Sequence, residues 1–108
     1  MLLAPKYISG QTKPLDGRLT GSIVDQAESV PIRQAHVWVH EWTGRGSYES
    51  KPDAVGNFEI RLPDGHYFVL VGAPGFAPIG KHVRIQSSKP IVLKLRMLPD
   101  SENMQDSR

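Results

Sequence analysis

The sequence contains no cysteine, so neither disulfide bridges nor thiolate metal sites contribute to this protein. That absence leaves the redox compartment open, because a cysteine-free chain suits either side of a membrane. There is also no apolar run long enough to cross a bilayer, and no membrane span is expected. The 108 residues, of which 39% are hydrophobic, predict one domain with a single core.

A strong charge of one sign is also missing. The formal net charge is only +2 at pH 7. Basic residues such as Arg84, Lys94 and Arg96 alternate with apolar ones, which is typical of the solvated face of a strand. This small and scattered excess argues against a nucleic-acid partner.

Helical periodicity is absent as well, since no window keeps apolar residues at helical spacing for three turns without Gly or Pro. Instead, about seven short runs alternate apolar and polar residues, which predicts an all-β sandwich or barrel. The expected inward residues, strand by strand, are Leu19, Gly21 and Ile23; Ala35, Val37 and Val39; a short run at 48–51; Phe58, Ile60 and Leu62; Tyr67, Val69, Val71 and Ala73; Val83 and Ile85; and Ile91, Leu93, Leu95 and Met97.

Glycine and proline set the expected turns between these strands, and the residues assigned to this structural role are Gly21, Gly56, Pro63, Gly65 and Gly75. Gly56 and Asn57 are expected to complete a hairpin with positive φ, and the proline and glycine of residues 62–65 a tight turn.

The two ends of the sequence differ from its middle. Residues 1–16, with Pro5 and Pro14 among polar residues, predict an extended arm, and residues 99–108 predict a polar tail. The sandwich is assigned to residues 17–98. The first residues have neither the basic start nor the apolar core of a signal peptide, so the chain is either cytoplasmic or begins after a removed leader.

Five segments between these ends resemble the carboxypeptidase regulatory-like domain family, a transthyretin-like (prealbumin-like) fold. They are a Gly-x-Val-x-Asp-like strand at 21–25, a Pro-Ile-x-x-Ala-x-Val-x-Val segment at 31–39, an Asp-x-x-Gly-x-Phe hairpin at 53–58, a Leu-Pro-x-Gly-x-Tyr segment at 62–67 and an Ala-x-Gly-Phe corner at 73–76. The resemblance covers roughly residues 17–98. One departure is Gln34, where the family usually has glycine.

The resemblance implies a seven-stranded Greek-key β-sandwich and a non-enzymatic role. Members of this family are usually accessory or structural modules of secreted peptidases, outer-membrane receptors and bacterial surface proteins. A location outside the cytoplasm, either extracellular, periplasmic or at the cell surface, is therefore implied, as is the absence of a cofactor. The residues that match the family are turn glycines and core positions, so the resemblance by itself assigns no binding site.

Aromatic residues occupy strand positions that are expected to face solvent. His36, Trp38, His40 and Trp42 alternate with inward valines and share the outward face of one strand. His36 and His40 are then about 13 Å apart along a strand, too far for one metal ion, and no metal site is predicted. Phe68 and Leu70 repeat the pattern on another strand, so an apolar outer surface is expected.

Three explanations of this surface stay open. Either the N-terminal arm or the loop at 43–50 covers it within the monomer, or it docks onto another protein or another copy of the chain, or its tryptophans stack on a polysaccharide. The predicted interaction surface comprises Trp38, Trp42, His36, His40, Phe68 and Leu70. A protein partner is the leading hypothesis, with carbohydrate binding as the alternative.

The sequence gives little indication of a catalytic site. The serines have no nucleophile-elbow context, and the carboxylates form no evident pair. Asp53, Asn57 and Asp64 would suit calcium, yet such residues in turns more often cap their own backbone. The transthyretin-like 5-hydroxyisourate hydrolases end in Tyr-Arg-Gly-Ser, which this C-terminus lacks. The protein is therefore not expected to be an enzyme.

Overall fold

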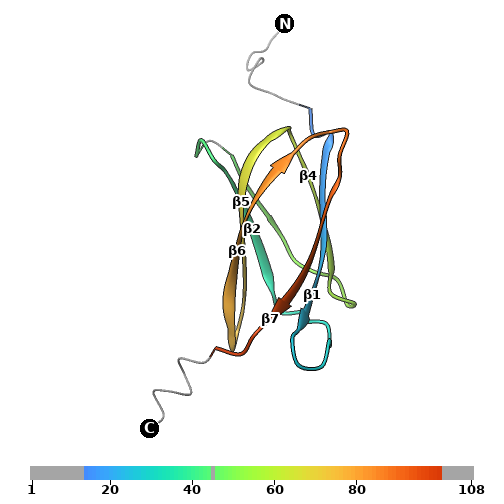
Figure 1. Ribbon diagram of the computed structural model, residues 1–108, viewed down its shortest axis with the longest axis vertical. Coiled ribbons are helices and arrows are strands. Elements are labelled where there is room, and N and C mark those ends of the chain that lie inside the picture. Colours follow the sequence, from blue (N-terminus) through green and yellow to red (C-terminus); the bar gives the residue numbers. More distant parts are fainter. Residues whose placement is uncertain (1–13, 45, 101–108) are drawn as a thin grey trace, which may run out of the picture.

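The structure, a computed structural model, describes residues 14–44 and 46–100, and these residues form seven strands and no helix (Figure 1). The strands are β1 (Gly17–Asp25), β2 (His36–Glu41), β3 (Ser47–Ser50), β4 (Asn57–Leu62), β5 (Gly65–Ala73), β6 (Phe76–Ile85) and β7 (Ile91–Met97). Within these ranges, no helix has the length and apolarity needed to span a bilayer. The predicted arm and tail lie almost wholly outside the described residues.

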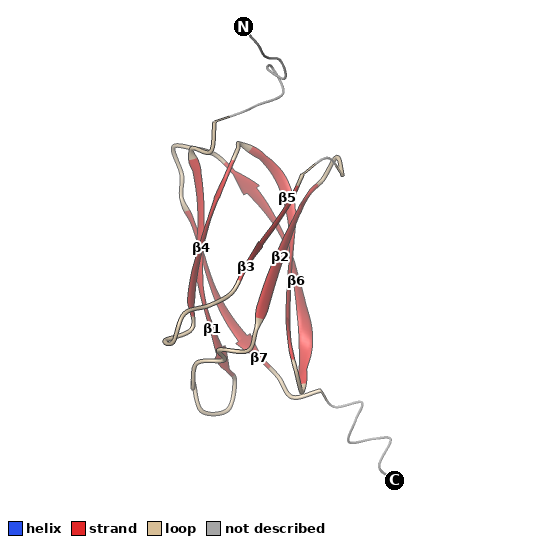
Figure 2. Cartoon of the chain, turned by 180° about the vertical axis from the view of Figure 1, so that it is seen from behind, coloured by secondary structure: helices blue, strands red, loops and turns tan. Residues whose placement is uncertain are grey.

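Two sheets face each other as the layers of a sandwich (Figure 2). One sheet has three strands in the order β4-β1-β7, and the other has four in the order β3-β2-β5-β6. β1 and β7 run parallel, and every other neighbouring pair is antiparallel. The prediction of an all-β, seven-stranded sandwich is confirmed.

The core follows from the alternation of the strands, because every second side chain points between the sheets. Its buried apolar residues are Leu19, Ile23, Ile32, Ala35, Val37, Val39, Phe58, Ile60, Leu62, Tyr67, Val69, Val71, Ile85, Leu95 and Met97. Burying each large aliphatic side chain contributes about 1.5–3 kcal/mol, so this layer is the main source of stability. All but Ile32 are inward positions that the alternation predicts.

The segment at 53–58 differs from the predicted hairpin. β3 belongs to the four-stranded sheet and β4 to the three-stranded sheet, so the segment crosses between layers. Gly56 does adopt a positive φ of 85°, but Asn57 does not and instead begins β4. The carboxylate of Asp53 accepts the backbone N–H groups of Val55 and Asn57 (3.0 and 2.9 Å), which is the self-capping expected of an Asx turn.

β6 is longer than the alternation indicates, because it begins at Phe76 and not near Val83. Pro78, Gly80 and Lys81 interrupt the apolar pattern in its first half, and none of them favours a strand. They are tolerated because β6 is the edge strand of its sheet, where one side of the backbone needs no partner.

Gly21 lies in the middle of β1 and not at a turn. It faces the core opposite Phe58, and a Cβ atom built on it would lie 2.6 Å from the Phe58 ring and 2.7 Å from the carbonyl oxygen of Leu93. Real Cβ atoms do not approach so closely, so the glycine makes room for the phenyl ring inside the sandwich.

Candidate functional site

The outer surface of the four-stranded sheet carries the residues predicted to interact with a partner. Its strand register places Trp38 opposite Leu70, His40 opposite Phe68, and Phe68 in turn opposite His82. Residues directly opposite each other in a sheet share a face. We call the set His36, Trp38, His40, Trp42, Phe68, Leu70 and His82 the aromatic face. One explanation of this surface places the loop at 43–50 over it. Residues 47–50 instead form β3, which pairs with β2 in the same sheet, so they do not lie over the aromatic face.

One half of the aromatic face is organised around Trp38. Its indole lies over Gly72, with ring atom Cζ3 at 3.4 Å from a Cβ built on that glycine. On its other side the ring stacks on His36, with centroids 4.3 Å apart and planes inclined by 28°. The Nε2 atom of His36 lies 3.0 Å from Glu49 Oε1, which fixes the imidazole over the indole. Trp38 therefore packs against both His36 and Gly72, and it is half-buried.

The other half is organised around Phe68 in the same way. A Cβ on Gly80 would lie 2.8 Å from Phe68 Cζ, so the phenyl ring occupies the space above that glycine. His82 packs edge-on against Phe68 (centroids 5.3 Å apart) and also contacts Trp42 (4.9 Å). Trp42 follows β2, where its backbone N–H donates to the His66 carbonyl (2.8 Å), and it is 66% exposed.

The sequence did not indicate His82, Gly72 or Gly80 as part of this surface. The strand register that brings His82 beside Phe68 is a long-range property, because β5 and β6 first have to pair. A local signal did exist for the glycines. Both occupy outward positions next to aromatic residues, where a glycine in a strand marks a close approach of another group.

The neighbours of the histidines in the aromatic face bear on whether they could hold a metal ion. In the described parts of the chain, no group of three or more His, Cys, Asp or Glu residues is close enough to share an ion. His36 is paired with Glu49, and His40 Nδ1 lies 3.3 Å from the hydroxyl of Ser47. The rings of His36 and His82 instead extend the flat apolar surface.

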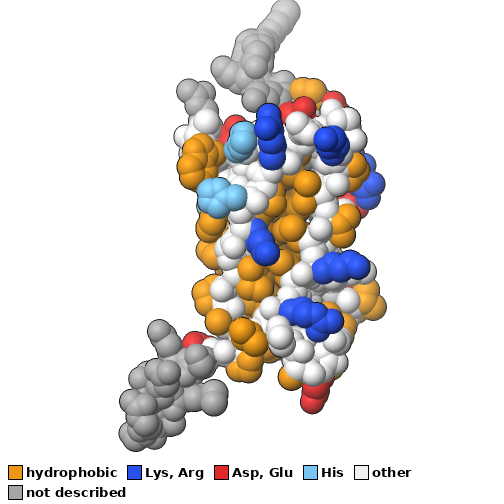
Figure 3. All heavy atoms as spheres, in the orientation of Figure 1, with side chains coloured by type: hydrophobic (Ala, Val, Ile, Leu, Met, Phe, Trp, Pro, Cys, Tyr) orange, Lys and Arg blue, Asp and Glu red, His pale blue; other side chains and the backbone are white. Residues whose placement is uncertain are grey.

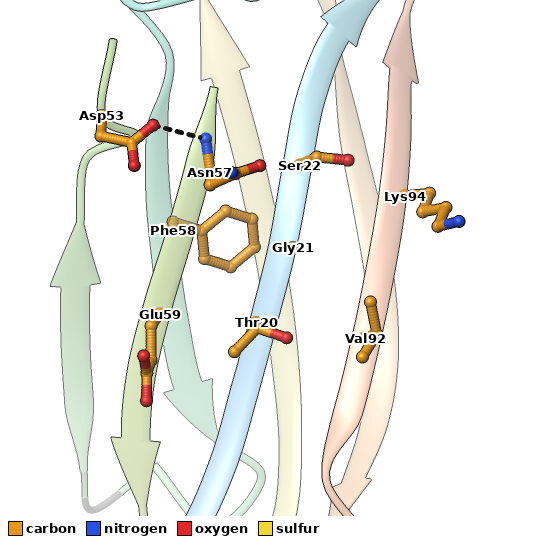
Figure 4. A pocket seen from close by; sticks show the side chains of 9 residues that line it. All are labelled: Thr20, Gly21, Ser22, Asp53, Asn57, Phe58, Glu59, Val92 and Lys94. Atoms are coloured by element: carbon orange, nitrogen blue, oxygen red, sulfur yellow. Dashed lines mark hydrogen bonds between the residues drawn. The ribbon is translucent and has the colours of Figure 1, made fainter. Parts of the chain in front are cut away.

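A shallow groove of about 470 Å³ lies on the opposite side of the molecule, on the outer face of the three-stranded sheet (Figure 4). The short side chains of Thr20 and Ser22 on the central strand β1 form its floor. Glu59 on β4 and Lys94 on β7 belong to its two walls. The groove exists because small residues in the middle strand are flanked by longer ones on both neighbours.

The groove lacks the arrangement that nucleophilic catalysis requires. A serine hydroxyl needs a base within hydrogen-bond reach, but His36, His40, His66 and His82 all belong to the outward-facing rows of the other sheet. Of the two acids that line the groove, Asp53 caps the turn before β4, and Glu59 is held by Arg18 (3.0 Å) and Arg61 (3.3 Å). Its hydrogen bond to Arg18 is the main reason that its pKa is lowered, so it stays ionised and is a poor proton acceptor.

A buried tyrosine also has a structural role. Burial, with smaller effects from Tyr48, Glu41 and Asp64, raises the pKa of Tyr67 to about 12. Its hydroxyl donates to the carbonyl of Pro63 (2.8 Å), which ties β5 to the turn after β4. The residues predicted to set this turn therefore act together with a core side chain.

Comparison with known proteins agrees with the fold. The sequence pattern of the family described as Carboxypeptidase regulatory-like domain matches residues 18–98. A search of curated proteins finds no match.

Three solved structures illustrate the likeness in fold. A pilus 2b backbone protein of group B streptococcus has a TM-score of 0.64 at 14% identity, covering 82% of this chain and 43% of its own. A protein of Bacteroides uniformis, named as a candidate carbohydrate-binding protein, has a TM-score of 0.59 at 17% identity, covering 76% and 41%. Hydroxyquinol 1,2-dioxygenase from Pseudomonas putida has a TM-score of 0.63 at 11% identity, covering 77% and 56%.

The chain therefore spans less than two thirds of each of these structures. At such low identities the likeness establishes the fold alone. A pilus protein, a sugar-binding candidate and an enzyme share this sandwich, so function has to be argued from the surfaces of this chain.

Proposed function

Since this chain belongs to the carboxypeptidase regulatory-like domain family, we propose that it is a non-catalytic structural module that works outside the cytoplasm and docks onto copies of itself or onto a neighbouring surface protein. Its contact surface is the aromatic face. The residues expected to make the contact are Trp38, Trp42, Phe68 and Leu70, and His36 and His40 border them.

A single observation carries this proposal. Trp38 packs against Gly72 and Phe68 against Gly80, and of the two tryptophans one is half-buried and the other 66% exposed. Ordered aromatic side chains at a surface with few charges are typical of the centre of protein interfaces. Glu49 and Arg84 are the charged residues in the outward rows of this sheet.

The location and the accessory role of the N-terminus are parts of the same proposal. Pilin structures among the similar folds support a place at the cell surface. Residues 1–16 act as an extended arm that adds to a sheet edge of the neighbouring subunit.

Solution mass separates this proposal from its alternatives. We expect the mass measured by light scattering to rise with concentration for the native protein and to stay that of a monomer for Trp42→Glu. A matched control is Val92→Glu on the other sheet, because Val92 is 63% exposed and Trp42 is 66% exposed. If both variants assemble as the native protein does, the aromatic face is the wrong surface.

Carbohydrate binding is the second candidate, and the exposure of Trp42 beside His82 favours it. Sugar rings stack on exposed indoles, so polysaccharide should change the tryptophan fluorescence of a monomeric protein. The response should disappear in Trp42→Ala and persist in Val92→Ala. A native protein that stays monomeric at all concentrations and responds to glycans would replace the first proposal with this one.

A further inference from the structure

The edge strands β6 and β7 of the two sheets lie on one side of the sandwich (Figure 1), and no strand ladder joins them. We call this side the opening. One end is closed by the hydrogen bond from Ala77 N–H to the Leu98 carbonyl (2.8 Å). The other end is closed by the short loop at 86–90, in which Lys89 N–H donates to Gln86 (3.0 Å). Between these ends, apolar side chains of both strands are only partly buried: Ile79, Val83, Ile91 and Leu93.

Both strands that border this opening have an unused backbone edge. β6 pairs with β5 alone, and β7 with β1 alone. From Pro78 to Arg84, no backbone hydrogen bond joins β6 to β7 within the described residues. Unpaired N–H and C=O groups at a sheet edge are a template for another extended chain.

The edge is also strongly basic. The sequence has no Asp or Glu from residue 65 to residue 99, whereas it places Lys81 and Arg84 on β6, Lys89 in the loop, and Lys94 and Arg96 on β7. In the ranges described, none of these five has an ion pair. Figure 3 shows Lys and Arg side chains gathered on this side around a band of hydrophobic atoms. The net charge of the whole chain conceals this concentration.

Lys81 is the most telling of these residues. It lies opposite the buried Val69, so its position faces the opening, yet it is exposed. An inward-pointing charge at an edge discourages pairing with apolar or basic strands. It does not discourage an incoming strand that carries a carboxylate at the matching place.

From these observations we infer that the β6–β7 edge binds an extended acidic segment of another protein as an added strand. Its backbone pairs with the free edge of β6, and its inward row places apolar side chains beside Ile79 and Val83 with a carboxylate between them, opposite Lys81. A polypeptide is favoured because it alone offers both a hydrogen-bonding ladder and a row of apolar side chains that a carboxylate can interrupt. A polysaccharide or nucleic acid has no apolar row for the opening.

The chain's own ends do not match this edge. Residues 1–13 contain Lys6 and Lys13 and no acid, and residues 101–108 contain Met104 as their only large apolar residue. Neither segment therefore has the pattern inferred for the partner. The inward row of β6 faces away from the aromatic face, to which β6 contributes His82 from its outward row.

The test uses an end-blocked synthetic peptide of 10 residues, the length of β6, in which threonines alternate with an inward row of valines that a single glutamate interrupts opposite Lys81. It is titrated into the isotope-labelled protein and followed by NMR. We expect shifts and new amide protection in β6 and β7, and affinity that falls as salt rises. The matched peptide with lysine in place of glutamate should not bind.

Two charge-reversal variants complete the test. Lys81→Glu should weaken binding of the glutamate peptide by at least about tenfold, whereas Lys51→Glu, an exposed lysine just after β3, should leave it unchanged. If Lys81→Glu does not fold, Lys81→Gln takes its place. No binding at millimolar peptide, equal binding of both peptides, or shifts confined to the aromatic face would overturn the inference. Trp42→Glu should still bind the peptide, so this result is independent of the proposed function.

Discussion

The two outer faces of this sandwich are built from the same alternation but have opposite characters. On the three-stranded sheet, Thr20 and Ser22 form a low polar floor, and Glu59 joins Arg18 (3.0 Å) and Arg61 (3.3 Å) across neighbouring positions. On the four-stranded sheet, the corresponding rows hold two organised aromatic rings, Trp38 and Phe68. The first face carries short polar side chains and ion pairs, whereas the second carries aromatic rings that pack against glycines.

The difference lies in the glycines as much as in the aromatic residues. Gly72 and Gly80 leave space that the rings of Trp38 and Phe68 occupy. An aromatic ring without such space would extend into solvent, where it would be mobile and fully exposed. Ordering the rings in the free protein lowers the entropic cost of binding a partner. Small residues next to large ones on an outer face therefore indicate a surface whose rings are ordered before any partner binds.

The largest expected effect is a difference in stability between two variants, one that loses an aromatic ring from one face and one that loses a small side chain from the other. Trp38→Ala should lower the free energy of unfolding by about 2 kcal/mol, since a half-buried indole loses its packing on His36 and Gly72. Thr20→Ala on the polar face should change it by less than about 0.5 kcal/mol. Urea unfolding of both variants measures the contrast, and equal losses would contradict it.

A smaller effect is expected from filling the space beneath a ring. Gly80→Val would place a Cβ only 2.8 Å from Phe68 Cζ, the tip of the ring, so the ring has to swing outward. The loss of stability should be about 1 kcal/mol, because the ring is the mobile end of a side chain. NMR contacts between the Phe68 and His82 rings should disappear. Ser22→Val on the polar face meets no such ring and serves as the control.

The smallest effect concerns the charges of the polar face. The pKa of Glu59 is lowered in the folded protein, chiefly by Arg18, so its stabilising contribution is present above the unfolded pKa and is lost as the pH falls through the folded one. Glu59→Gln should therefore unfold at a slightly lower temperature than the native protein at pH 7. The gap should close below the usual titration range of glutamate. A gap that is constant from pH 7 to about pH 3 would rule out this ion pair as the cause.

The core was predictable residue by residue, because burial along a strand has a period of two that any local window reveals. Val37, Val39 and Val69 are fully buried as expected. The family resemblance is confirmed by the match over residues 18–98. Where the sequence misled, the local signal was weak or ambiguous. Pro78 and Gly80 hid the first half of β6, and the turn after β3 gave no sign that it crosses between the sheets.

The surfaces were less predictable than the core. Trp38 and Phe68 were identified as outward aromatics, but their grouping with His82 depends on the pairing of β5 with both β2 and β6. The basic edge was missed for a similar reason. Lys81 and Lys94 look scattered along the chain, and they flank one opening only because β6 and β7 end up as the edges of facing sheets.

By itself, then, the sequence determined the strands, most of their inward residues and, for the part of the chain that the structure describes, the absence of helices, since alternation and turn chemistry act over a few neighbouring residues. The tertiary structure alone decided which outward residues meet, which glycines lie under which rings, and where unpaired edges and basic side chains coincide. These depend on strand order and register, which are set by contacts between residues far apart in the chain.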